Sequence, residues 1–222
     1  MVEGFFDEIP DSRQDWKVLH SIDEILTVVM CGVSAGENTI HGIYAFSEIK
    51  ERWLREKVGL KLPNGLPSYD TIRRTMGMID TKVFQRLFIK WIEEKLNLKE
   101  GSYISIDGKT VKGSGNDEKS KGKETVESRY FICSIDDMID FAEAVRSHWA
   151  VVNNLHWCLD VIFNEDACPI LDKNTAENIA IIRRIIYNRI KMQLKPKEQL
   201  CFGKRSCMYD DGYRLKIMFS HI

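Results

Sequence analysis

Tyr103-Ile-Ser-Ile-Asp-Gly-Lys-Thr110 is the stretch from which the architecture of this chain can best be predicted. Residues 103–106 alternate β-prone and small polar side chains, a pattern that predicts a short buried strand. Asp107 follows at the end of this strand, and Gly108 opens a tight turn behind it. A carboxylate in this position can hold a divalent metal ion at the rim of an α/β core. The pattern also fits an Asp-Gly turn without chemistry, so the local sequence leaves both interpretations open.

The sequence before this strand predicts helices. Ser21 and Glu24 have the spacing of a capping box, and a nearly continuous apolar segment follows them. Apolar residues at helical spacing predict three further helices, over about 40–57, about 70–78 and about 81–96. Ser68 and Thr81 are the expected N-caps of the last two. We therefore expect residues 1–98 to form an all-helical domain.

After Asp107 the sequence predicts a second strand behind a polar loop. Residues 113–125 (GSGNDEKSKGKET) offer no apolar anchor and are expected to form a loop. Residues 128–133 (SRYFIC) have the composition of a strand. With residues 103–106 this strand would make a two-stranded sheet, which is marginal unless helices cover it.

Two helices are predicted in the last third of the chain. Asp136 or Asp137 is expected to cap a helix that runs towards Trp157. Asn174 with Glu177 resembles a capping box for a long final helix. The apolar face of that helix is expected to carry Ile179, Ile182, Ile186 and Ile190.

The composition is that of a globular protein, with 44% hydrophobic and 29% charged residues. The net charge of −1 excludes a globally basic protein, so any site for a polyanion must be local. The longest apolar run, residues 25–33, is too short to span a bilayer, and no export signal is evident. We therefore expect a cytoplasmic protein whose six cysteines are reduced, although a zinc site that includes Cys201 and Cys207 stays open.

A basic segment runs from Arg183 to Arg205. It contains Arg183, Arg184, Arg189, Lys191, Lys195, Lys197, Lys204 and Arg205. Glu198 is the single acid among them. Such a segment can bind DNA phosphates in a salt-sensitive manner. A solvated helix face would have the same composition, so both interpretations stay open.

Histidines and acids are concentrated between residues 146 and 166. The pairs His148-Trp149 and His156-Trp157 are eight residues apart, which places them on nearly the same face of a helix. They could bind zinc or simply pack as His-Trp pairs. The acids of this region, which could ligate a metal or face solvent, are Asp160, Glu165 and Asp166.

Several longer motifs occur in a fixed order along the chain. They are Ile9-Pro-Asp-x-Arg13, Cys31-Gly-Val-Ser-Ala-Gly36, Asn64-Gly-Leu-Pro-Ser-x-Asp-Thr71, Asp107-Gly-Lys-Thr110, Arg129-Tyr-Phe-Ile132, Arg146-x-His-Trp-x-Val-x-Asn-x-x-His-Trp-x-x-Asp-Val161, Asn164-Glu-Asp166 and Lys204-Arg-x-x-x-Tyr-Asp-Asp-x-Tyr213. In content and order they resemble the H-repeat-associated branch of the bacterial insertion-sequence transposases. The resemblance covers nearly the whole chain.

This resemblance implies an RNase H-like DDE nuclease that cuts and joins DNA ends, with three carboxylates holding two Mg²⁺ ions about 4 Å apart. It makes Asp107 the first catalytic and metal-binding acid. The second acid belongs to a Thr-Asp-Ala-like segment that this chain lacks, and the slot of the third is occupied by Val152. We therefore expect an internal deletion near residues 113–127, a defective catalyst and no bound Mg²⁺.

The expected fold is mainly α (α+β). A helical transposase-associated domain at 1–98 would precede a truncated RNase H-like domain at 99–222, with one short two-stranded sheet and C-terminal helices. The expected DNA-binding residues are Lys109, Arg146, Arg183, Arg184, Arg189, Lys204 and Arg205.

Three functions stay open for this chain. The first is an inactive transposase relic. The second is a non-catalytic protein that binds the ends of insertion sequences, forms a homo-oligomer or joins that of an intact transposase. The third is a metal nuclease that uses Asp107, Asp160 and either Glu165 or Asp166. No membrane partner is expected.

Overall fold

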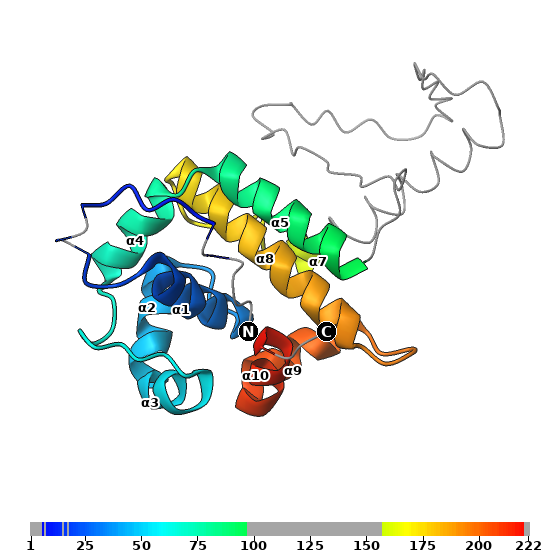
Figure 1. The fold of residues 1–222 in the computed structure, drawn as a ribbon. Coiled ribbons are helices and arrows are strands. Elements are labelled where there is room, and N and C mark those ends of the chain that lie inside the picture. The colour runs from blue at the N-terminus through cyan, green and yellow to red at the C-terminus, as the bar shows by residue number, and fades with distance from the viewer. Residues whose placement is uncertain (1–5, 7, 15, 17, 97–156, 220–222) are drawn as a thin grey trace, which may run out of the picture.

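The structure is a computed structural model that describes residues 6, 8–14, 16, 18–96 and 157–219, and the regular elements of these residues are all helical (Figure 1). They are α1 (Ile22–Ser34), α2 (Ile40–Ile49), α3 (Glu51–Trp53), the π-helical turn η2 (Leu54–Val58), α4 (Tyr69–Met78), α5 (Thr81–Leu96), α7 (Trp157–Val161), α8 (Lys173–Gln193), α9 (Leu200–Tyr209) and α10 (Asp211–Phe219). The expectation of a mainly helical chain is confirmed for this part. The strands predicted at 103–106 and 128–133 lie outside it, so the two-stranded sheet and the RNase H-like remnant stay predictions.

Two of the predicted helix N-caps are confirmed. The Ser21 hydroxyl accepts a hydrogen bond from the backbone N–H of Glu24 at 3.1 Å, at the start of α1. The Ser68 hydroxyl accepts one from Thr71 at 3.2 Å, at the start of α4. Each bond satisfies one of the N–H groups that a first helical turn leaves without an intrahelical partner.

Two further predicted N-caps are wrong, and in both cases a nearby aspartate caps the helix instead. The cap predicted at Asp136 or Asp137 lies outside the described residues. The Asp80 carboxylate, not Thr81, accepts from the second and third residues of α5, at 2.8 and 3.0 Å. Asp172, not Asn174, caps α8 by accepting from the N–H of Thr175 at 2.8 Å. A carboxylate is also favoured over a neutral side chain at this end of the helix by the helix dipole.

The helix predicted over about 40–57 is present but interrupted. It ends as α2 at Ile49, Lys50 leaves the helical conformation, and the chain resumes as α3 and η2. Gly59 terminates this segment with a φ of +85°, a left-handed conformation that glycine adopts without steric cost.

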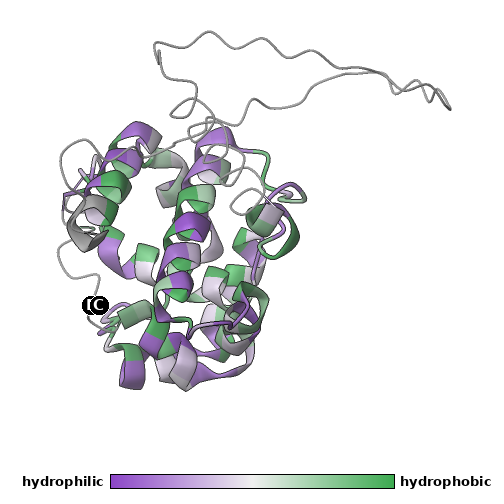
Figure 2. Cartoon of the chain, turned by 90° about the vertical axis from the view of Figure 1, so that its right-hand side faces the viewer, coloured by the Kyte–Doolittle hydropathy of each residue, from purple (hydrophilic) through white to green (hydrophobic). Residues whose placement is uncertain are grey.

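The long helix α8 packs against α1, α4 and α5, and it carries the centre of the core (Figure 1). Its predicted apolar stripe is confirmed, because Ile179, Ile182, Ile186 and Ile190 are all fully buried. Hydrophobic and hydrophilic residues alternate along the helices, as amphipathic packing requires (Figure 2). One hydrophobic cluster contains buried residues up to Trp91 and buried residues from Leu159 onward. Described residues on both sides of the predicted 98/99 boundary therefore share a core.

Two elements of the C-terminal part were not predicted from the sequence. Residues 200–219, which follow the predicted final helix, form α9 and α10. These helices fold back so that α9 packs against α8 and α1, and α10 against α8, α1 and η2. A salt bridge of 2.7 Å from Lys50 to Asp211 links α10 to the end of α2. Among the described helices, none combines the length and the apolar character needed to cross a membrane.

Candidate nucleic-acid interface

The predicted site residues fall into two groups. Four of them lie outside the described residues: Asp107, Lys109, Arg146 and Val152. Their predicted roles stay predictions. The structure describes the remaining cations, Arg183, Arg184, Arg189, Lys204 and Arg205, and it places them in very different surroundings.

Lys204 is buried against the C-terminal end of α1. Its ammonium donates hydrogen bonds to the carbonyl oxygens of Val33 at 2.8 Å and Ser34 at 3.2 Å. It also lies 4.9 Å from the centroid of the Phe163 ring. Burial lowers the pKa of this ammonium to about 8. Since the last carbonyls of a helix lack intrahelical partners and carry partial negative charge, Lys204 acts as a C-cap supplied by a distant helix.

Arg183 and Arg189 are buried on α8, with 1% and 2% of their surface exposed. The Arg189 Nε donates to the carbonyl of Ile217 on α10. The Arg183 guanidinium lies 3.5 Å from Asn38 Oδ1 and 3.4 Å from Cys168 Sγ. Both arginines therefore connect α8 to segments packed on it.

These contacts bury three of the cations that were predicted to bind DNA. A DNA phosphate cannot reach Arg183, Arg189 or Lys204 while the helices stay packed. Arg184 is half-buried and pairs with Glu165 at 3.5 Å, and Arg205 is exposed. DNA binding by the described part of the chain, which stays a prediction, therefore has to rely on other cations besides Arg205.

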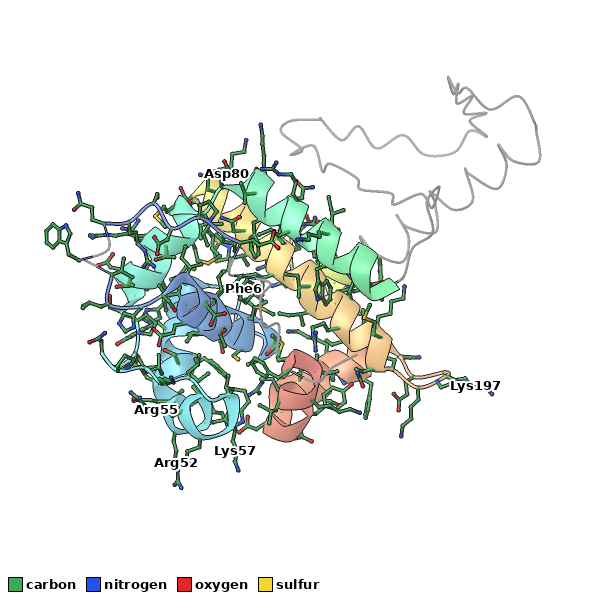
Figure 3. The ribbon with its side chains drawn as sticks, viewed as in Figure 1. Phe6, Arg52, Arg55, Lys57, Asp80 and Lys197 are labelled. Carbon is green, nitrogen blue, oxygen red and sulfur yellow. The ribbon has the colours of Figure 1, made fainter. Side chains whose placement is uncertain are left out.

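Such cations lie where α8 passes into α9. Four of them are exposed: Lys191 at the end of α8, Lys195 and Lys197 in the connection, and Arg205 on α9. The connection projects from the helical body, and Lys197 lies at its tip (Figures 1 and 3). We call these four cations, together with the exposed Phe202, the α8–α9 surface.

The acid within this surface is engaged by the backbone. Glu198, the single acid between positions 183 and 205, accepts a hydrogen bond from the N–H of Lys195 at 2.9 Å. Residues 183–205 therefore carry a local excess of positive charge in the sequence, although the whole chain carries a net charge of −1. This local excess is what contact with a polyanion requires.

The described residues offer no metal site. Among them, no three His, Cys, Asp or Glu side chains are grouped so that they could hold a metal ion. Glu165, considered above as a substitute ligand, is paired with Arg184, and Asp160 and Asp166 also have interactions. The described part of the chain thus gives no support to a metal nuclease built on these acids.

The zinc site considered for Cys201 and Cys207 also finds no support in the described residues. Cys201 is exposed, whereas Cys207 is buried, and both are free thiols. Burial raises the pKa of Cys207 to about 11, which disfavours the thiolate that zinc would bind.

The comparisons with known proteins point to transposases. Residues 4–92 match the family model described as DDE_Tnp_1-associated. "Putative transposase YncI" of Escherichia coli K12 is 40% identical over 113 residues, which are 51% of this chain and 45% of that protein. "H repeat-associated putative transposase YhhI" of the same strain is 33% identical over 114 residues, 51% of this chain and 30% of that protein.

A shorter relative is matched over most of its own length. "Inactive transposase YbfQ" of Escherichia coli K12 is 36% identical over 67 residues, which are 30% of this chain and 77% of that protein. The matches thus span less than half the length of YncI and YhhI but more than three quarters of YbfQ. No solved structure matches the chain significantly.

Proposed function

Because this chain belongs to the H-repeat-associated family of insertion-sequence transposases, we propose that it binds DNA but has lost the strand-transfer activity of an intact DDE enzyme. The observation that carries the DNA-binding half of this proposal is the α8–α9 surface. Its cations Lys191, Lys195, Lys197 and Arg205 are exposed, and Glu198, the single acid in residues 183–205, already accepts a hydrogen bond from the backbone.

The catalytic half of the proposal follows from the acids that the sequence lacks. Two Mg²⁺ ions would activate the attacking oxygen and stabilise the leaving oxygen in an intact relative, and a set of carboxylates would have to hold them. This chain supplies Asp107 but has Val152 in the slot of the Glu, and valine can neither ligate a metal nor accept a proton. No Thr-Asp-Ala-like segment lies between Lys112 and Arg129, which supports an internal deletion there.

The surviving cations favour binding over catalysis. Contacts from lysine and arginine to phosphates need no metal and no defined base, because counterion release supplies most of the affinity. Exposed side chains on a projecting connection can reach the backbone of a duplex without rearrangement of the core. Binding at the ends of insertion sequences would let this protein compete with an intact transposase for the same DNA.

One experiment tests both halves. The full chain is incubated with supercoiled plasmid and Mg²⁺ or Mn²⁺, and retardation and nicking are read from the same gel. The test variant is Lys195→Ala/Lys197→Ala/Arg205→Ala. The matched control is Arg52→Ala/Lys57→Ala/Lys61→Ala, which removes the same charge from exposed positions; Arg52 and Lys57 lie far from Lys197 (Figure 3).

We expect retardation by the wild type and the control variant, loss of retardation in the test variant, and no nicking by any of them. Equal loss in both triple variants would show a mere effect of net charge and would contradict the assignment of the surface. Metal-dependent nicking that disappears in Asp107→Ala would contradict the proposed loss of catalysis.

A further inference from the structure

Phe202 is held outward on α9 by the packing of the opposite face of that helix. Its surface is 60% exposed, although phenylalanine is usually buried. Gly203, Lys204 and Cys207 form the buried face of α9. A Cβ atom at Gly203 would lie 2.5 Å from Cγ2 of Ile190, so α9 is in close contact with α8. Phe202 therefore cannot turn inward without separating the two helices.

Exposed cations are close to Phe202 in the sequence. Arg205 is three residues further along the same helix, a spacing that makes the two side chains neighbours. Lys195 and Lys197 lie in the connection that leads directly into α9. Lys191 lies in the last turn of α8, directly before this connection, and it is exposed.

An exposed aromatic ring among cations fits a particular form of nucleic acid. In a duplex the faces of the bases are hidden in the stack, so cations alone suffice for contact with the backbone. In an unpaired strand the base faces are accessible, and proteins that bind such strands combine a positively charged path for the phosphates with aromatic rings on which bases stack.

We propose that the α8–α9 surface binds unpaired DNA strands, with Phe202 stacking on a base and the four cations contacting the flanking phosphates. This inference rests on the proposed DNA binding at the same surface and specifies the form of DNA that the surface prefers. A protein partner would use Phe202 as an apolar contact and would be indifferent to its aromaticity, which provides a way to separate the two cases.

The test compares binding of a fluorescent single strand of about 10 nucleotides with binding of the same sequence as a duplex, by anisotropy. The variants are Phe202→Leu, which keeps an apolar side chain but removes the aromatic face, and Phe202→Trp, which keeps a stacking surface. Because the Phe202 side chain is exposed, both variants are expected to unfold thermally at the temperature of the wild type.

We expect the wild type to prefer the single strand. Phe202→Leu should weaken single-strand binding by about 5- to 150-fold and leave duplex binding unchanged, while Phe202→Trp should bind like the wild type. Equal effects of Phe202→Leu on both forms, or no effect on either, would overturn the inference.

The failures of this inference and of the proposed function are distinguishable. If the wild type binds neither form, both fail. If it binds duplex through the cations and Phe202→Leu changes nothing, DNA binding stands and the single-strand inference fails. A change of sedimentation coefficient in Phe202→Leu without DNA would assign the ring to contact between copies of the chain and would also overturn the inference.

Discussion

Lys204 caps the end of a helix that lies 171 residues earlier in the chain, with its ammonium 2.8 Å from the carbonyl oxygen of Val33. This hydrogen bond ties α9 to α1, and a second bond of 3.2 Å reaches Ser34. A side chain that composition alone would assign to a DNA-binding face is therefore part of the interior. The neighbouring Arg205, on the outer face of the same helix, provides a matched comparison.

Removal of this ammonium should destabilise the fold. In Lys204→Met the apolar stem remains, but the Val33 and Ser34 carbonyls lose the ammonium as a donor in a buried place, and the Val33 carbonyl keeps the N–H of Gly36 at 3.1 Å. The expected cost is about 1–3 kcal/mol. Arg205→Met should change the free energy of unfolding by less than about 0.5 kcal/mol, because Arg205 is exposed. Urea unfolding of both variants measures the difference. A Lys204→Met variant as stable as the wild type would show that relief of the buried charge offsets the lost hydrogen bonds.

The same lysine predicts a dependence of stability on pH. Burial lowers the pKa of Lys204 from an ordinary value of 10.5 to about 8, so between these values the unfolded chain binds the proton more tightly than the folded chain. The free energy of unfolding of the wild type should therefore rise, relative to Lys204→Met, from about pH 8 to about pH 10.5, by at most about 1.4 kcal/mol per pH unit. Below about pH 8 the difference between the two proteins should be constant. A difference that falls above pH 8 would mean that folding raises this pKa.

The cap of α5 can be tested against its neighbour. Asp80→Ala removes the acceptor for the N–H groups of Lys82 and Val83 and should cost about 1 kcal/mol. Thr81→Ala should cost nothing or stabilise, since the Thr81 hydroxyl is buried without a hydrogen-bond partner. Thermal unfolding of the two variants should rank them in that order, and the reverse order would restore Thr81 as the cap.

Thiol reactivity should report the burial of α1 and α9. Cys201 is exposed, whereas burial raises the pKa of Cys31 to about 12 and that of Cys207 to about 11. A maleimide should therefore modify Cys201 in the native protein and reach Cys31 and Cys207 only after unfolding. Mass spectrometry of peptides from a time course resolves the sites. Early modification of Cys207 would show that α9 opens readily.

The helices could be predicted from the sequence because their signals are local. The four isoleucines of α8 recur at helical spacing, and Ser21 and Ser68 stand directly before their helices. The caps of α5 and α8 could not be predicted, because each helix start offers two residues that can cap it, Asp80 or Thr81 and Asp172 or Asn174. The local sequence does not decide at which of the two the helix begins.

The surroundings of the cations depend on contacts that are distant in sequence. Lys204 lies on the same face of α9 as Gly203 and Cys207. If α9 had been recognised as a helix, this spacing would have indicated that the Lys204 side chain is buried. Its partner, the end of α1, could not be identified from the sequence. Phe202 lies on the opposite face of α9 and is exposed, because the face that carries Lys204 is the one that packs on the core.

The most direct test of the central claim is the salt dependence of duplex DNA binding. With contacts from Lys191, Lys195, Lys197 and Arg205, the logarithm of the binding constant should fall against the logarithm of salt concentration with a slope of about −3 to −4. The slope should shrink to about −1 in Lys195→Ala/Lys197→Ala/Arg205→Ala and stay unchanged in Arg52→Ala/Lys57→Ala/Lys61→Ala. Equal slopes for the wild type and the first variant would contradict the assignment of DNA binding to the α8–α9 surface.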